Sequence, residues 1–303
     1  MTSVLYDVPG PKAILRNRIL GAVTIVALVA LFAWVLWLFI DSGQLTAQKW
    51  SIFGYTTIWE QIVGGLVSTL LAFVSAAVGS LVFAVVFAVG RLSDHAWVRI
   101  PFTIVIEVFR AIPVLIFMMI MYYGLPSVGV SVSPYLAVVV ALIAYNGSVM
   151  AEAIRAGVAS LPKGQTEAGY AIGLRKSGVM TFILLPQAFR AMLPVILAQL
   201  VVTLKDTALG SIITYDELLY VAKLIGGQLA YGRPYIPAAI LIGGIYIVLC
   251  LLLSLVARTV EKRMRKSPKV RLAGGPKDPR QHEGATNTSV ILQQGEPDAD
   301  GRV

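Results

Sequence analysis

Acidic and basic side chains occur in pairs inside two otherwise apolar stretches of the sequence, and these are the groups best placed to do chemistry. Glu107 precedes Arg110 by three residues, and Glu152 precedes Arg155 by the same interval. Residues three apart lie on one face of a helix, so each pair can neutralise itself. Ionisable groups in apolar surroundings are costly and usually functional. The spacing leaves two interpretations open for each pair: a structural ion pair or contact with a polar ligand.

The elements that must position these charges are long apolar runs. Hydrophobic residues make up 57% of the chain and charged residues 14%, against about a quarter charged in a soluble domain. A membrane span needs about 20 mostly apolar residues, and proline or glycine divides longer runs. We therefore predict an all-α polytopic membrane protein with about six transmembrane helices, at residues 19–40, 61–89, 100–124, 135–155, 188–204 and 235–257.

A third charged group, Lys205 with Asp206, is followed by the polar Thr207. Only 14 uncharged residues separate Arg190 from Lys205. At about 1.5 Å per residue they rise about 21 Å, less than the hydrocarbon thickness of about 30 Å. Either this helix begins below the bilayer edge, or Lys205 and Asp206 lie within the bilayer. Gly210 favours a broken segment that lines a cavity, where irregular backbone is tolerated.

Lysine and arginine predict a multi-pass protein of the cell membrane with both termini in the cytoplasm. Of the 25 basic residues, 20 fall in segments that this orientation makes cytoplasmic, as the positive-inside rule requires. We expect a first part at residues 1–60, a transmembrane core at 61–257 and a basic tail at 258–303. The tail suits anionic membrane lipids, and its composition past Gly274 predicts disorder. The net charge of +9 therefore needs no nucleic acid to explain it.

The longest internal cytoplasmic loop covers residues 160–186 and carries a helical pattern. Glu167 lies near the start of that pattern, where a carboxylate suits the helix dipole. Gly173 and Gly178 permit a sharp turn afterwards, and Pro186 restarts the chain. We expect a short amphipathic helix across the cytoplasmic surface, whose free face meets either the lipid interface or a partner protein.

This loop resembles the EAA loop of ATP-binding-cassette (ABC) import permeases. The family pattern is Glu-Ala-Ala, a later glycine and a final pair of a hydrophobic residue and proline, matched here by Glu167, Ala168, Gly169, Gly173, Leu185 and Pro186. Gly169 departs from the usual second alanine, which trades helix propensity for close approach. The resemblance implies a coupling helix that docks on an ATPase subunit, anchored by Glu167 and turned at Gly173.

Three further segments resemble the polar amino-acid group of type I ABC importer permeases. They are residues 109–113 (FRAIP), 151–165 (AEAIRAGVASLPKGQ) and 204–209 (LKDTAL). The first departs from the family's F-R-G-T-P at Ala111 and Ile112. Together the motifs cover residues 66–257 and are similar to the glutamate-uptake branch of actinobacteria. The resemblance makes residues 61–257 the permease core.

The resemblance also implies a set of partners. The chain would pair with a second permease subunit, identical or homologous, with two ATPase subunits that bind ATP and Mg, and with an extracytoplasmic amino-acid-binding protein. The chain itself has no GxxxxGK[ST] loop, and His95 and His282 are too few for a histidine-rich metal site. We expect no catalytic residue, no metal and no bound cofactor, so the subunit is not an enzyme.

A zwitterionic amino acid needs a cation for its carboxylate and an acceptor for its ammonium group. The candidates for the substrate path are Arg110, Glu107, Glu152, Lys205, Asp206 and Thr207. Two cations near one cavity disfavour arginine and lysine as substrates, so we expect glutamate. The alternative is an ATP-independent channel or ion-coupled carrier, which explains the buried charges but gives the loop around Glu167 no purpose.

Overall fold

The computed structural model describes residues 10–265, and this part of the chain is helical throughout, with turns and no strand. The all-α prediction is therefore confirmed. The long helices are α1 (Pro11–Asp41), α3 (Thr56–Arg91), α6 (Pro134–Ala159), α9 (Leu185–Asp206) and α11 (Tyr235–Arg265). Within the described residues, five helical stretches are long and apolar enough to cross a membrane, or six if one bent pair forms a single span.

Shorter elements connect these helices or extend them. They are α2 (Ala47–Trp50), η1 (Ser51–Gly54), α4 (Ala96–Ala111), α5 (Val114–Met119), η2 (Ile120–Gly124), η3 (Leu125–Val128), α7 (Lys163–Ala171), α8 (Lys176–Gly178), η4 (Val179–Leu184), η5 (Thr207–Ile213), α10 (Leu218–Gly226) and η6 (Leu229–Tyr231). The elements η2 and η4 are π-helical turns, and the other η elements are 3₁₀ turns.

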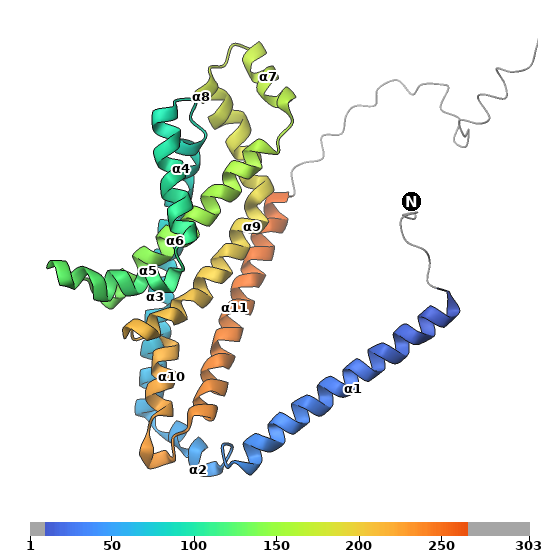
Figure 1. The fold of residues 1–303 in the computed structure, drawn as a ribbon, viewed down its shortest axis with the longest axis vertical. Coiled ribbons are helices and arrows are strands. Elements are labelled where there is room, and N and C mark those ends of the chain that lie inside the picture. The colour runs from blue at the N-terminus through green and yellow to red at the C-terminus, as the bar shows by residue number, and fades with distance from the viewer. Residues whose placement is uncertain (1–9, 266–303) are drawn as a thin grey trace, which may run out of the picture. The chain divides into compact units, whose positions relative to one another are not determined.

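The centre of the bundle is the contact between α3 and α6, which cross in Figure 1 with α9 beside them. Small residues make this contact close. Ala72, Ala76 and Ala141 are fully buried, and Gly147 leaves room for the ring of Phe83. Lipid tails are as apolar as leucine, so helices in a membrane associate by close packing rather than by the hydrophobic effect. The small side chains are therefore what holds α3 and α6 together.

The third predicted span, residues 100–124, is wrong as a single helix. The chain ends α4 at Ala111 and starts α5 at Val114, and the two directions differ by 98°. Ile112 between them has an extended backbone, because the residue before a proline avoids helical dihedral angles. Pro113 then begins the new helix, where its missing N–H costs no hydrogen bond.

The fifth span, predicted at residues 188–204, is also longer than expected. Helical structure runs from Lys176 to Ile213, so the expected restart at Pro186 and the turn at Gly178 are both wrong. In a regular helix the ring of Pro186 would meet the carbonyl group of Phe182. The wider π-helical turn η4 covers Phe182, and such turns accommodate an interrupted hydrogen-bond ladder.

The two ends of the chain differ from the core in their packing. None of the residues of α1 is buried, although its composition suits a span. At the other end α11 continues to Arg265, so the beginning of the expected basic tail extends the last helix. The expected disorder past Gly274 lies outside the described residues.

We expect Gly147→Val to destabilise the bundle by about 1–3 kcal/mol, the usual cost of overpacking. A Cβ atom at Gly147 would lie 2.8 Å from Cδ1 and 3.0 Å from Cβ of Phe83. The matched control is Gly64→Val on α3, where a Cβ atom meets nothing within 4 Å. Thermal unfolding of the purified variants in detergent measures the difference. Equal loss of stability in both would contradict the packing argument.

Candidate functional site

Five charged side chains from three helices form one connected set, which we call the charged network. Arg91 at the end of α3 donates to Glu152 Oε2 on α6 at 2.6 Å and to Glu107 Oε1 on α4 at 2.9 Å. Arg155 binds both oxygens of Glu152, at 2.6 and 3.0 Å. Arg110 reaches Glu107 Oε2 at 3.4 Å. The network therefore ties α3, α4 and α6 together.

Both ion pairs that the three-residue spacing predicts are present, but the sequence did not reveal Arg91, which joins them. Arg91 has the least exposed side chain of the five, at 15%. A guanidinium presents a planar fork of five donors, which suits one arginine to bridging two carboxylates. The available signal was the position of Arg91 at the end of an apolar run, whose nearest acidic residue in the sequence, Asp94, pairs with Lys176 instead.

Lys205 and Asp206, the other charged group predicted from the sequence, do not join the charged network. Lys205 is exposed and Asp206 is partly buried at the end of α9. Thr207 is fully buried, and its hydroxyl group donates to the carbonyl of Leu204 at 2.7 Å. Among the described residues, no hydrogen bond or ion pair links these three side chains to Arg110. Their contact with a substrate stays a prediction, although the helix does change to a tighter 3₁₀ turn at Thr207.

Two further polar groups lie inside the bundle and were not singled out from the sequence. Asn146 on α6 accepts a hydrogen bond from Gln199 on α9 at 2.6 Å. Glu217 is fully buried and caps α10, accepting from the backbone N–H groups of Leu219 and Tyr220 and from the hydroxyl of Tyr246. An acidic residue directly before an apolar helical run is the sequence signal of such a cap.

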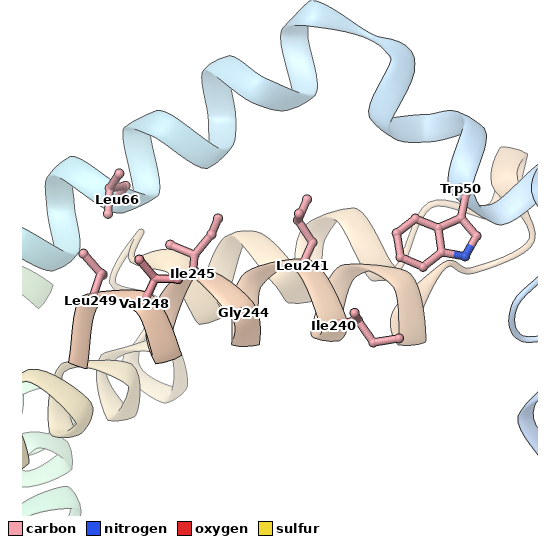
Figure 2. Close-up of a pocket in the computed structure, with 8 residues that line it drawn as sticks. All are labelled: Trp50, Leu66, Ile240, Leu241, Gly244, Ile245, Val248 and Leu249. Atoms are coloured by element: carbon pink, nitrogen blue, oxygen red, sulfur yellow. The ribbon is translucent and has the colours of Figure 1, made fainter. Parts of the chain in front are cut away.

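The cavity drawn in Figure 2 has the wrong chemistry for a polar ligand. Its volume is about 520 Å³. In Figure 2, Leu66 of α3 faces Ile245 and Leu249 of α11, and Leu241 lies farther along α11 toward Trp50. The lining side chains are apolar apart from the indole nitrogen of Trp50. A charged amino acid bound there would leave its ionised groups unpaired, at a cost of several kcal/mol.

The helix expected in the loop at residues 160–186 is present as α7, and one glycine lets it pack closely against η4. Glu167 and Ala168 are exposed, whereas Gly169 is buried. A Cβ atom at Gly169 would lie 2.8 Å from Val179 Cγ2 and 3.0 Å from Ile183 Cδ1. The absence of a side chain therefore lets α7 lie directly on η4. Leu185 and Pro186 follow η4 at the start of α9, with Leu185 half-buried and Pro186 exposed.

The other face of α7 and the turn after it are open. Tyr170 is 47% exposed and Ile172 is 75% exposed. Gly173 has a φ angle of +82°, in the left-handed region that favours glycine, so the turn expected there is confirmed. The α7 segment, residues 163–174, thus presents apolar and acidic side chains on a helix that packs against η4.

An ion pair connects the region after α7 to the α3–α4 loop. Lys176 of α8 binds the carboxylate of Asp94. The hydrogen bond from Lys176 holds the pKa of Asp94 below its usual value. The pair is therefore present at pH values above the ordinary carboxyl pKa and is lost as the pH falls through the lowered one. Asp94 is three residues from Arg91, so α8 and the charged network meet at the same loop.

Comparison with known proteins gives consistent similarities. Residues 80–266 match the family described as binding-protein-dependent transport system inner membrane component. The chain is 41% identical over 229 residues to the glutamate transport system permease protein GluD of Corynebacterium glutamicum, covering 74% of this chain and 82% of that protein. It is 32% identical over 224 residues to the L-cystine transport system permease protein TcyB of Bacillus subtilis, covering 72% and 92%.

Solved structures agree with the sequence comparison. A chain of an amino acid ABC transporter crystallised with histidines superposes with a TM-score of 0.64 at 29% identity, covering 72% of this chain and all of that one. A chain of the MetNI methionine ABC transporter superposes with a TM-score of 0.57 at 19% identity, covering 69% and 99%. The second likeness is one of fold.

We expect Gly173→Val to loosen the α7 segment and Gly173→Asn to leave it nearly unchanged. A β-branched residue at positive φ costs about 1–3 kcal/mol, whereas asparagine tolerates this region. Hydrogen exchange of residues 163–174, followed by mass spectrometry, should become about tenfold faster in the valine variant alone. If both variants exchange alike, the left-handed turn does not hold the segment in place.

Proposed function

This chain belongs to the family of binding-protein-dependent transport system inner membrane components, and we propose that it is the permease subunit of an ABC importer for a polar amino acid, specifically glutamate. Relatives named as glutamate and cystine permeases support the amino-acid class. ATP is hydrolysed by a separate subunit, so this chain supplies the membrane path and no catalysis. Family membership counts against the alternative of an ATP-independent channel or carrier.

The observation that carries the proposal is the surface of the α7 segment. Glu167 and Tyr170, three residues apart on α7, are both exposed, as is Ile172 directly after the helix, while Gly169 packs against η4. Apolar side chains rimmed by charge on a rigid helix suit insertion into a groove of a partner. The α7 segment is the coupling helix in this proposal, and the ATPase is the partner.

Force applied to α7 has two routes into the membrane part. One route is the contact of Gly169 with Val179, which leads through η4 into α9. The other is the ion pair between Lys176 and Asp94, which leads into the α3–α4 loop. ATP binding would close the ATPase pair, move the two coupling helices together and open the path outward.

The substrate path in this proposal is lined by the charges predicted from the sequence. Arg110 and Lys205 supply cations for the two carboxylates of glutamate, and Asp206 supplies an acceptor for its ammonium group. Glu107 and Glu152 hold the arginines, and Thr207 marks the point where α9 becomes a tighter turn. Two cations near one path favour a substrate that carries a side-chain carboxylate.

The complete transporter needs several further subunits. A second permease, identical or homologous, would complete the path, and two ATPase subunits would bind ATP and Mg on the cytoplasmic side. An extracytoplasmic amino-acid-binding protein would deliver the substrate. Both chain termini are cytoplasmic in this arrangement, and the basic residues of the C-terminal region face anionic lipid.

We expect Glu167→Lys to lower ATP-dependent glutamate uptake about tenfold or more, because it reverses a charge at the proposed docking surface. Uptake is measured in vesicles that contain all the subunits, together with the amount of ATPase that co-purifies. The matched control is Glu60→Lys, an exposed acidic residue near the start of α3. Normal uptake by the Glu167 variant would contradict the coupling role of α7.

We expect glutamate and aspartate to compete best against labelled glutamate, ahead of glutamine, with arginine and lysine weakest. Arg110→Ala and Lys205→Ala should each reduce the advantage of glutamate over glutamine about tenfold, because each removes a cation from the path. If arginine competes best in the wild type, the assignment of an acidic substrate is wrong. If neither substitution changes the order, these two residues are structural.

A further inference from the structure

The charged network does not balance its own charges. It contains three guanidinium groups, from Arg91, Arg110 and Arg155, and two carboxylates, from Glu107 and Glu152. With all five groups ionised the network carries one net positive charge. The excess is located where α3, α4 and α6 meet, close to the bend between α4 and α5.

The three arginines are satisfied to very different degrees. Arg155 makes a two-point contact with Glu152, and Arg91 makes two contacts with two different carboxylates, at 2.6 and 2.9 Å. Arg110 makes one contact, to Glu107, and at 3.4 Å it is the longest in the network. Charge-assisted hydrogen bonds are normally about 2.7–2.9 Å. Arg110 is thus the arginine whose donors are least used.

Arg91 competes with Arg110 for the charge of Glu107. Glu107 and Arg110 are three residues apart on α4 and would neutralise each other if nothing else approached. Arg91 binds the other oxygen of Glu107 at the shorter distance. Because Arg91 comes from α3, this competition depends on the packing of α3 against α4 and not on the sequence around Arg110.

The side chain of Arg110 is partly exposed and lies just before a break in the helix. Arg110 is in the last turn of α4, and its side chain is 37% exposed within the subunit. The helix breaks two residues later, at the 98° bend. At membrane depth, irregular backbone is tolerated where it is buried in protein or lines a water-filled cavity, and broken helices in transporters surround the substrate.

We propose that Arg91 is a positioning residue that makes this permease selective for acidic amino acids. By holding Glu107 and Glu152, it keeps the network positive and leaves the guanidinium of Arg110 for the side-chain carboxylate of the substrate. The inference rests on the proposed function and assigns the substrate class of the same path to a residue that need not touch the substrate.

The charge account predicts opposite effects for two substitutions. Arg91→Gln removes the excess charge and frees Glu107 to neutralise Arg110, so the preference for glutamate over its neutral isostere glutamine should fall about tenfold. Glu107→Gln raises the net charge and frees Arg110, so the same preference should rise. The double variant Arg91→Gln/Glu107→Gln again carries one net positive charge and should return to within about threefold of the wild type.

The test is competition binding to the purified complex of permease and ATPase subunits without the binding protein, so that the membrane path alone sets the preference. Labelled L-glutamate is displaced by unlabelled L-glutamate or L-glutamine, and the ratio of the two dissociation constants is compared among the variants. Arg99→Gln is the matched control, because it removes an exposed arginine of α4 outside the charged network.

A fall with Arg91→Gln, a rise with Glu107→Gln and a recovery in the double variant support the proposal. Weaker binding of both ligands with an unchanged ratio overturns it, since that is the effect of a purely structural arginine. An equal change with Arg99→Gln also overturns it, because general surface charge would then be the cause. ATP-dependent uptake by the wild type is measured in parallel. If uptake is present and the ratio does not respond, the inference fails while the proposed function stands.

Discussion

The close contact between α3 and α6 is the constraint on which the other parts of the structure depend. It is made by alanine and glycine positions such as Ala76, Ala141 and Gly147, whose small size lets the two backbones approach. The same approach brings Arg91, at the end of α3, within 2.6 Å of Glu152 on α6. A largely buried arginine without a carboxylate partner is expensive, so the close packing that brings Glu152 within reach is what makes Arg91 tolerable at this place. Packing and charge therefore specify one arrangement together.

Local chemistry explains which parts of the fold the sequence predicts. The all-α class and the long spans follow from apolar composition, which acts over a whole segment, and the turn at Gly173 follows from one residue. The bend at Ile112 and Pro113 was missed because mostly apolar residues continue on both sides of it, although the proline was visible. The opposite error occurred at Pro186, where the π-helical turn η4 carries the helix past a proline that was expected to interrupt it.

In the candidate site too, contacts within one helix were predicted from the sequence and contacts between helices were not. The pairs Glu107–Arg110 and Glu152–Arg155 form as their spacing predicts, because both partners lie on one helix. The role of Arg91 depends on two residues that are 16 and 61 positions away, and no pattern in a single sequence specifies such distant contacts. Gly169 shows an intermediate case. Its departure from alanine pointed to close approach, but the surface that it approaches, Val179 and Ile183, became evident only from the packing of η4.

The position of Asp94 places the proposed coupling helix next to the charged network. Lys176 follows the α7 segment and binds Asp94, and three residues earlier in the chain Arg91 binds two carboxylates. The exposed pair contributes little to stability by itself, whereas Arg91 and Glu152 are largely buried and resist separation. A displacement of α7 therefore breaks the weak Lys176–Asp94 pair before it disturbs the stronger Arg91–Glu152 pair. If α7 is the coupling helix, as we propose, an arrangement of this kind lets it move by a small distance before the helices around Arg110 must rearrange.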